Sequence, residues 1–258
     1  MPIVKVTESR WKSAQEWESL HWQAEQGIRQ KGCRSFLRRA KRLVKRILTK
    51  ELGDDWNHWW AEKFAYYALV PEAIEHAIEL GCGPYTNMRI ISQTRKIHYL
   101  YCSDPLALKY IKLRSWLSNA YYKGRVLIDT HPAEECPYAS GLFDLVVMVN
   151  VLGHVFDAER CVQQAMRITK RVGLLVLGQD LTSSDDIPDE CDIDIGHPIR
   201  LTHDLLDDWL SKEFDPLFYS VLPREEGRNP EAHYGTYIYI GRKKKSNYDD
   251  PEGFRIPQ

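Results

Sequence analysis

The chain has 258 residues, of which 28% are charged and 43% are hydrophobic. This length allows one large domain or a domain with an extension, and the ordinary content of aromatic, glycine and proline residues excludes global disorder and fibrous structure. A formal net charge of −1 also excludes nucleic-acid binding driven by phosphate attraction along the whole chain, so no nucleic-acid partner is expected.

Residues 1–73 are predicted to form a helical N-terminal extension. A stripe that begins at Trp11 and ends at Trp22 recurs at steps of three and four residues, which is typical of one face of a helix. Apolar residues at the same spacing within 36–48 predict a second helix. The segment 54–69 predicts a third helix, which begins at an aspartate cap and stops before a proline.

The charge along the chain is uneven. Residues 1–50 hold 13 Lys and Arg against 4 Glu, whereas the rest of the chain is net acidic. Within this part, residues 29–50 carry ten basic side chains and no acid. The favoured interpretation is an amphipathic helix that packs its apolar stripe on the following domain and leaves the charges in water. The alternative is that the segment binds an anionic membrane surface or an acidic partner.

From about residue 74 short apolar runs alternate with longer amphipathic segments. This alternation predicts a doubly wound, mostly parallel α/β sheet over residues 74–245, with crossover helices such as Pro105–Leu117 and Ala158–Thr169. Residues 246–258 are expected to form a polar tail. The predicted strands are residues 74–80, 96–102, 125–129, 143–150, 172–178 and 235–241.

Two glycines and an acid stand where ligands bind in open α/β sheets, at the carboxyl ends of strands. Gly81 and Gly83 follow the first strand and allow the backbone to approach a ligand, and Asp104 ends the second strand, where a carboxylate can accept ribose hydroxyl groups. An adenosine-type cofactor is therefore expected. A dinucleotide is disfavoured, because Thr86 stands where the third Gly or Ala is usual and Glu79 would repel a pyrophosphate.

Five ordered motifs carry a resemblance over about residues 74–181: AIELGCGPYTN, YCSDPL, PAEECPY, FDLVVMVNVLGHVFD and VGLLVLGQD. Together they resemble the class I S-adenosylmethionine-dependent methyltransferases. The resemblance implies a seven-stranded Rossmann-like sheet with an N-terminal helical extension, and S-adenosylmethionine as the cofactor.

The resemblance also implies the cofactor site. Residues from the first motif would flank the methionine part, with Glu79 facing the positive centre, and Asp104 would bind the ribose. Pro132 stands where the family commonly has an Asp, so adenine recognition would depend on Glu134 or on backbone groups. The cofactor-binding residues implied are Glu79, Gly81, Cys82, Gly83, Asp104, Pro105, Ala133, Glu134 and Asn150.

Acceptor-side residues follow the fourth and fifth strands and the segments after them. His154 and Asp180 are the candidate catalytic residues, since a hydroxyl acceptor needs a base and histidine titrates near neutral pH. His197, Arg228 and His233 are candidate substrate-binding residues, although each histidine could simply hold a loop and Arg228 could be solvated. No clustered carboxylate set points to a metal, so no metal is expected.

Six tryptophans in the extension could line the acceptor pocket, because aromatic faces suit sugars and flat rings. Packing in the core of the helical layer is the favoured reading for them. They are Trp11, Trp17, Trp22, Trp56, Trp59 and Trp60.

The function expected is methyl transfer to a small-molecule or glycan acceptor, with a sugar hydroxyl preferred. The alternatives are an NAD(P)-dependent oxidoreductase or epimerase, and a catalytically silent module that binds a partner. Six scattered cysteines without a CxxC pair suit a reducing compartment, so a cytoplasmic protein is expected, or one bound peripherally to a membrane through residues 29–50. The sequence indicates no oligomeric state.

Overall fold

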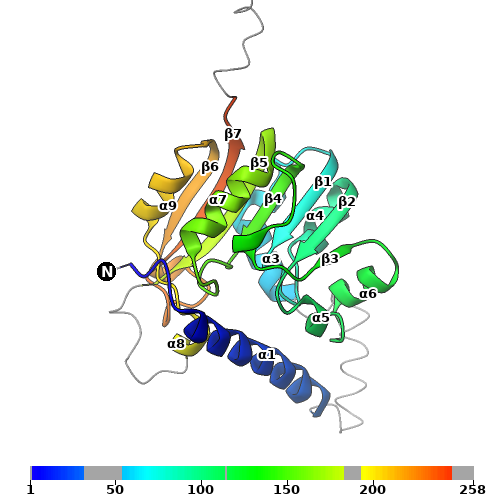
Figure 1. Cartoon of the computed structure of the whole chain (residues 1–258), viewed down its shortest axis with the longest axis vertical. Coiled ribbons are helices and arrows are strands. Elements are labelled where there is room, and N and C mark those ends of the chain that lie inside the picture. Colours follow the sequence, from blue (N-terminus) through cyan, green and yellow to red (C-terminus); the bar gives the residue numbers. More distant parts are fainter. Residues whose placement is uncertain (1, 32–53, 114, 183–192, 246–258) are drawn as a thin grey trace, which may run out of the picture.

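The computed structural model describes residues 2–31, 54–113, 115–182 and 193–245. Within these ranges the chain forms one seven-stranded sheet in the order β3-β2-β1-β4-β5-β7-β6 (Figure 1). The neighbouring strands from β3 to β5 are parallel, and β7 runs antiparallel to both β5 and β6. The strands are β1 (Ala73–Leu80), β2 (Lys96–Ser103), β3 (Leu127–Asp129), β4 (Phe143–Val149), β5 (Thr169–Leu181), β6 (Phe214–Pro223) and β7 (Gly235–Lys243).

The predicted doubly wound, mostly parallel Rossmann-like sheet is confirmed. All six predicted strands are present, but β6 has no counterpart among them. Its residues are mostly exposed or half-buried, as expected of an edge strand, and therefore lack the continuous apolar run by which the others were identified. The helices are α1 (Glu8–Lys31), α3 (Asp54–Lys63), α4 (Met88–Thr94), α5 (Ala107–Tyr110), α6 (Trp116–Tyr122), α7 (Ala158–Ile168), α8 (Ile193–Gly196) and α9 (His203–Leu210).

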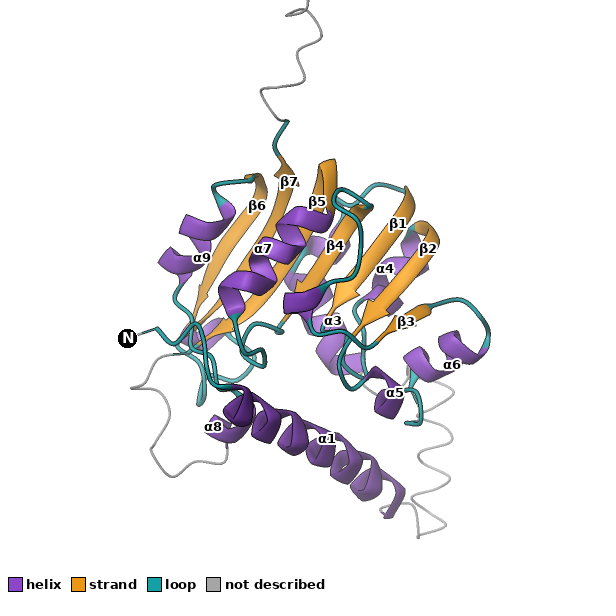
Figure 2. Cartoon of the chain, in the orientation of Figure 1, coloured by secondary structure: helices purple, strands orange, loops and turns teal. Residues whose placement is uncertain are grey.

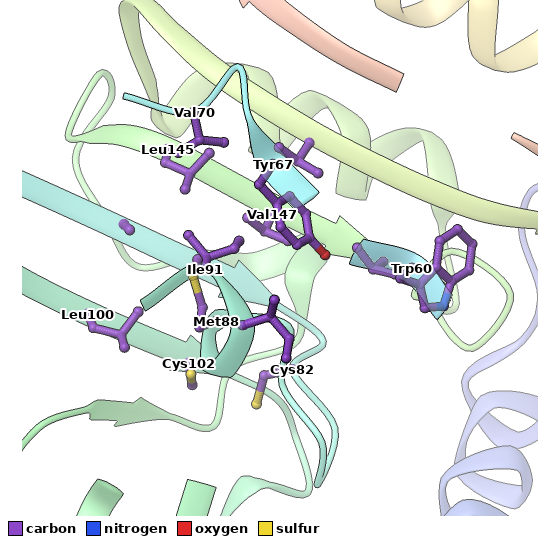
Figure 3. Close-up of a cluster of buried hydrophobic side chains, with 14 of the residues drawn as sticks. Trp60, Tyr67, Val70, Cys82, Met88, Ile91, Leu100, Cys102, Leu145 and Val147 are labelled. Atoms are coloured by element: carbon purple, nitrogen blue, oxygen red, sulfur yellow. The ribbon is translucent and has the colours of Figure 1, made fainter. Parts of the chain in front are cut away.

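Two apolar clusters, one on each face, hold the sheet between its helices. Helices α7 and α9 pack over β4 to β6 on the face turned toward the viewer in Figure 2. Helices α3 and α4 pack on the opposite face, where Trp60, Met88 and Val147 belong to one buried cluster (Figure 3). The four cysteines that the structure describes are buried and unpaired.

Two helix predictions need correction. The helix predicted over 54–69 ends at Lys63, because Ala65, Tyr66 and Tyr67 all adopt positive φ and turn the chain so that Tyr67 is buried. The helix predicted over 105–117 is two helices, α5 and α6. Ser115 starts the second, since its side chain accepts a hydrogen bond from the backbone N–H of Ser118.

Helix α1 confirms the predicted helical face between Trp11 and Trp22, and it crosses the edge of the sheet where the parallel strands end (Figure 1). The basic segment predicted over 29–50 lies outside the described residues except for the last turn of α1, and the predicted tail over 246–258 lies wholly outside them. In the described part of the chain, no helix combines the length and apolarity needed to cross a membrane.

Candidate active site

A cavity of about 540 Å³ opens at the carboxyl ends of β1, β2, β4 and β5, and α1 forms its opposite wall. This volume lies within the range of small-molecule sites, about 300 to 1,000 Å³. Every site residue predicted from the sequence lines this one cavity. They are Glu79, Gly81, Cys82, Gly83, Asp104, Pro105, Ala133, Glu134, Asn150, His154, Asp180, His197, Arg228 and His233.

The glycine loop after β1 has the geometry that the sequence predicted. Gly81 and Gly83 adopt φ of +64° and +54°, a region that side chains with a Cβ rarely occupy. A Cβ at Gly81 would lie 2.6 Å from Val151, whereas a Cβ at Gly83 would meet no atom within 4 Å. Gly81 is thus required for packing, and the backbone at Gly83 is left accessible to a ligand.

Asp104 is buried beside this loop, directly after β2. Its Oδ2 accepts a hydrogen bond from the Gly83 N–H (3.1 Å), and its Oδ1 accepts one from the Leu106 N–H (2.8 Å). Burial raises the pKa of Asp104 to about 7, although these two hydrogen bonds favour the ionised form. Each oxygen keeps a further lone pair with which it can accept a ligand hydroxyl.

The carboxylate of Glu79, which lines the cavity, is occupied by contacts within the protein. Its buried carboxylate accepts hydrogen bonds from the Thr86 hydroxyl, from the backbone and side-chain nitrogens of Asn87 (3.1 and 2.9 Å), and from the Met88 N–H (3.2 Å). Burial raises the pKa of this group, and these donors oppose the rise. Glu79 therefore braces the glycine loop against α4, rather than presenting an open charge to a cationic ligand.

Ala133 and Glu134, which the resemblance to the methyltransferase family places at the adenine edge, have different surroundings. Ala133 presents a small apolar wall to the cavity. The Oε1 atom of Glu134 accepts hydrogen bonds from the backbone N–H groups of Phe156 (2.8 Å) and Asp157 (3.2 Å). Glu134 thus holds the turn that leads into α7, so adenine recognition cannot rely on a fully open carboxylate there.

Asn150 directly follows β4 and has a φ of +55°, an uncommon conformation for a residue other than glycine. Its Oδ1 accepts hydrogen bonds from the Asp180 N–H (3.3 Å) and from the side chain of Gln179 (3.4 Å). Such backbone strain persists where the surrounding structure enforces it, and it often occurs at functional sites. The side chain of Asn150 thereby ties the end of β4 to the end of β5 at the cavity wall.

His233 and Asp180 form a pair that the sequence placed in separate roles. The Nε2 atom of His233 lies 3.6 Å from Oδ2 of Asp180, and Oδ1 of Asp180 accepts a hydrogen bond from the Thr236 hydroxyl (2.9 Å). The Nδ1 atom of His233 is buried and has no hydrogen-bond partner among the described residues. Burial raises the pKa of Asp180, while His233, Thr236 and Arg228 favour its charged form.

His154 differs from His233 because its Nδ1 has a hydrogen-bond partner. Its Nδ1 lies 2.9 Å from the carbonyl oxygen of Gly196, and because a carbonyl only accepts, Nδ1 carries the hydrogen. Burial lowers the pKa of His154 to about 4 against the effect of this bond, so the ring is neutral at physiological pH. The ring of His197 packs beside it, with 4.4 Å between centroids.

The far wall of the cavity is aromatic. Trp11 and Trp17 of α1 line it, and Trp22 and Trp56 both line it and pack against the core. The guanidinium of Arg228 stacks on Trp56, 4.0 Å from the ring centroid. The sequence favoured core packing for all six tryptophans. Of these, only Trp59 and the fully buried Trp60 pack in the core without also lining the cavity.

Helix α1 adds a group that the sequence did not mark as functional. Glu18 lines the cavity, with its side chain only 17% exposed. The sequence placed it on the face of a helix, but nothing there indicated which domain surface that face would cover. No three His, Cys, Asp or Glu side chains in the described ranges are arranged to hold a metal ion.

Comparison with known proteins assigns this fold. Residues 78–177 match the sequence family described as a methyltransferase domain. These residues are a class I S-adenosylmethionine-dependent methyltransferase domain. No curated protein matches the chain in sequence.

Solved structures share the fold of this methyltransferase domain at low sequence identity. A protein of Haloferax volcanii, solved with the methyltransferase activator Trm112, has a TM-score of 0.57 at 15% identity, over 76% of this chain and 93% of that one. The N-methyltransferase NodS of Bradyrhizobium japonicum, solved with S-adenosylhomocysteine, has a TM-score of 0.52 at 13% identity, over 73% and 85%. YcgJ of Bacillus subtilis has a TM-score of 0.54 at 12% identity, over 73% and 100%.

The cofactor of the family is S-adenosylmethionine, and the cavity of this methyltransferase domain fits it. The open backbone at Gly83 leaves space where a Cβ would stand, which suits the amino-acid part. Asp104 lies beside that space with lone pairs available for ribose hydroxyl groups. Ala133 offers an apolar surface to a flat base. The residues present therefore suit each part of the molecule.

Proposed function

We propose that the protein transfers a methyl group from S-adenosylmethionine to a hydroxyl of a small-molecule or glycan acceptor, preferably a sugar. When bound, the cofactor supplies an electrophilic methyl group on a sulfonium sulfur. The chain must then align the acceptor, exclude water and remove the hydroxyl proton. The pair of His233 and Asp180 in the cavity wall is the observation that carries the proposal.

His233 is the base that the geometry favours. Asp180 faces Nε2 of the ring and would stabilise the imidazolium that forms when Nδ1 accepts a proton. Nδ1 is buried and has no hydrogen-bond partner among the described residues, so the proposal requires that the bound acceptor brings its hydroxyl group to this atom. His154 suits this role less well, because a pKa of about 4 makes it a weak base at neutral pH. His154 instead orders the α8 turn beside the acceptor.

The acceptor preference is supported by the character of the wall opposite the cofactor residues. Indole rings pack well on sugar rings and on flat rings, and Trp17, Trp22 and Trp56 line the cavity. One face of Trp17 already packs on His21. Arg228, which lies over the ring of Trp56, and His197 also line the cavity and offer polar contacts to an acceptor. A ring that carries hydroxyl groups can pack against the tryptophans and can also donate a hydroxyl hydrogen to the base.

The test is turnover with a panel of acceptors. The purified protein would be incubated with S-adenosylmethionine and, in separate reactions, with sugars, glycans, phenols and amines, and the formation of S-adenosylhomocysteine would be measured. We expect product formation with a hydroxyl acceptor and its loss in His233→Gln. Turnover with amines alone, or a chain that binds NAD(P) and ignores S-adenosylmethionine, would overturn the proposal. Cofactor binding without turnover of any acceptor would favour the silent binding module.

A further inference from the structure

Glu18 is a carboxylate that α1 places in the wall of the cavity opposite the strand ends. Its side chain is only 17% exposed, and the residue lines the cavity. A carboxylate is rarely buried to this extent without full pairing, because removing a charge from water is costly. The contacts of each carboxylate oxygen therefore show whether Glu18 is left with an unfilled place for a ligand.

One oxygen of Glu18 is satisfied and the other is open. Oε1 accepts a hydrogen bond from the indole N–H of Trp22 on the same helix. Oε2 lies 3.7 Å from Nδ1 of His154, but the hydrogen on that nitrogen is directed to the carbonyl of Gly196 at 2.9 Å. Among the described residues, Oε2 thus has no hydrogen-bond donor.

Three other acids that line the cavity are more fully occupied, whereas Asp104 accepts one hydrogen bond on each oxygen. Glu79 accepts four hydrogen bonds, three from the loop that follows β1 and one from the first residue of α4. Glu134 accepts two from backbone N–H groups, and Asp180 is shared between Thr236 and His233. Glu18 therefore adds a carboxylate with an open oxygen to the cavity, from a different element of the fold than Asp104.

We infer that Glu18 selects the charge state of the cofactor: its carboxylate, held over the cavity by α1, favours cationic S-adenosylmethionine over neutral S-adenosylhomocysteine. The inference rests on the proposed function. In the cofactor, the sulfur joins the ribose to the amino-acid part, so a ribose at Asp104 and an amino-acid part at the glycine loop leave the sulfur between them. A carboxylate on the facing wall attracts that sulfonium, and this attraction is only weakly screened because the site is partly shielded from solvent. Loss of the positive charge after transfer weakens this attraction and favours product release.

Calorimetric titration of the full chain with each ligand separately tests this inference. In wild type we expect S-adenosylmethionine to bind more tightly than S-adenosylhomocysteine. In Glu18→Gln we expect the affinity ratio to shift toward S-adenosylhomocysteine by about five- to tenfold, with little change in the affinity for the neutral ligand. Glu16→Gln is the matched control, because Glu16 lies on the same helix but is exposed to solvent, and it should leave the ratio unchanged.

A second variant separates charge from packing. Glu18→Asp retains the carboxylate and should keep the preference for the cationic ligand, even where α1 is disturbed. Equal weakening of both ligands in Glu18→Gln, or an unchanged ratio, would overturn the inference and assign Glu18 to the packing of α1. A folded wild-type protein that binds neither ligand would overturn the proposed function, and the inference with it.

Discussion

The Nε2 atom of His233 lies 3.6 Å from Oδ2 of Asp180 because β5 and β7 are antiparallel neighbours at this end of the sheet. Asp180 pairs in register with Thr236, whose hydroxyl donates a hydrogen bond to Oδ1 of the same carboxylate. The turn before β7 is fixed by the Tyr234 N–H, which donates a hydrogen bond to the Leu181 carbonyl (3.1 Å). The sheet register thus positions the candidate base.

Removal of the base should abolish most turnover without affecting cofactor binding. For His233→Gln we expect kcat to fall by about 10²- to 10⁴-fold, which is the usual contribution of general base catalysis, while the dissociation constant of S-adenosylhomocysteine changes little. Asp180→Asn should also lower kcat, because the imidazolium loses its counter-charge. Steady-state kinetics and calorimetry measure both quantities. His98→Gln, at an exposed position on β2, is the control, and a kcat within twofold of wild type for His233→Gln would contradict the assignment.

Gly83→Val should block the cofactor site while leaving the fold intact. The Cβ position at Gly83 has no neighbour within 4 Å, so the valine side chain would project into open cavity, and φ of +54° adds strain of about 1–2 kcal/mol for a residue with a Cβ. We expect the affinity for S-adenosylhomocysteine to fall more than tenfold in a calorimetric titration. Gly124→Val is a matched control, since Gly124 has a similar φ of +65° and equal space but lies outside the cavity lining. If both variants lose affinity equally, the loss reflects general strain.

Cofactor affinity should rise with pH near neutrality. The pKa of Asp104 is raised to about 7 by burial, and a ribose hydroxyl donates its hydrogen more favourably to the ionised carboxylate. Affinity for S-adenosylhomocysteine should therefore increase between pH 6 and pH 8, and this dependence should be much weaker in Asp104→Asn. Titrations at three pH values in this window measure it. A slope that persists unchanged in the variant would assign the effect to another group.

The proton on Asp104 should also affect the stability of the ligand-free protein, which we expect to fall as pH rises, whereas cofactor affinity rises. Between the ordinary pKa of an aspartate, about 3.9, and the folded-state value of about 7, the folded chain holds a proton on Asp104 that the unfolded chain has released. The free energy of unfolding should therefore fall as pH rises through this window. Denaturant unfolding of wild type and Asp104→Asn should show a smaller fall in the variant, and identical pH profiles would contradict the raised pKa.

Gly196→Ala should loosen α1 from the cavity. A Cβ at Gly196 would lie 2.5 Å from the ring of Trp17, so α1 or α8 has to move. We expect faster limited proteolysis within α1 and weaker cofactor binding, with a melting temperature close to that of wild type because the sheet is not involved. Gly153→Ala is the control, because the nearest atoms to a Cβ at Gly153 lie at an ordinary 3.6 Å. Unchanged proteolysis in Gly196→Ala would show that α1 is not held by this contact.

The sequence predicted those parts of the site that depend on one strand and the turn after it. Gly81, Gly83 and Asp104 could be placed because the carboxyl ends of parallel strands meet at one edge of a sheet. The role of Glu79 could not be predicted, since its donors come from the folded loop at Thr86 and Asn87 rather than from any spacing pattern.

Long-range relationships were beyond the reach of sequence patterns. The pairing of His233 with Asp180 depends on the antiparallel register of β5 and β7, and the placement of Glu18 depends on how α1 crosses the strand ends. The end of α3 depends on Tyr66 and its neighbours adopting positive φ, which tertiary packing stabilises against local helix preference. In each case, contacts between distant segments decide the outcome.

Titration of S-adenosylmethionine into wild type and into Asp104→Ala is the most direct test of the cofactor site. We predict saturable one-site binding in wild type and an affinity at least tenfold weaker in the variant, which corresponds to about 1.4 kcal/mol. The assignment of the cofactor site would be contradicted if folded wild type gave no heat with either S-adenosylmethionine or S-adenosylhomocysteine. Equal affinity in wild type and Asp104→Ala would also contradict it.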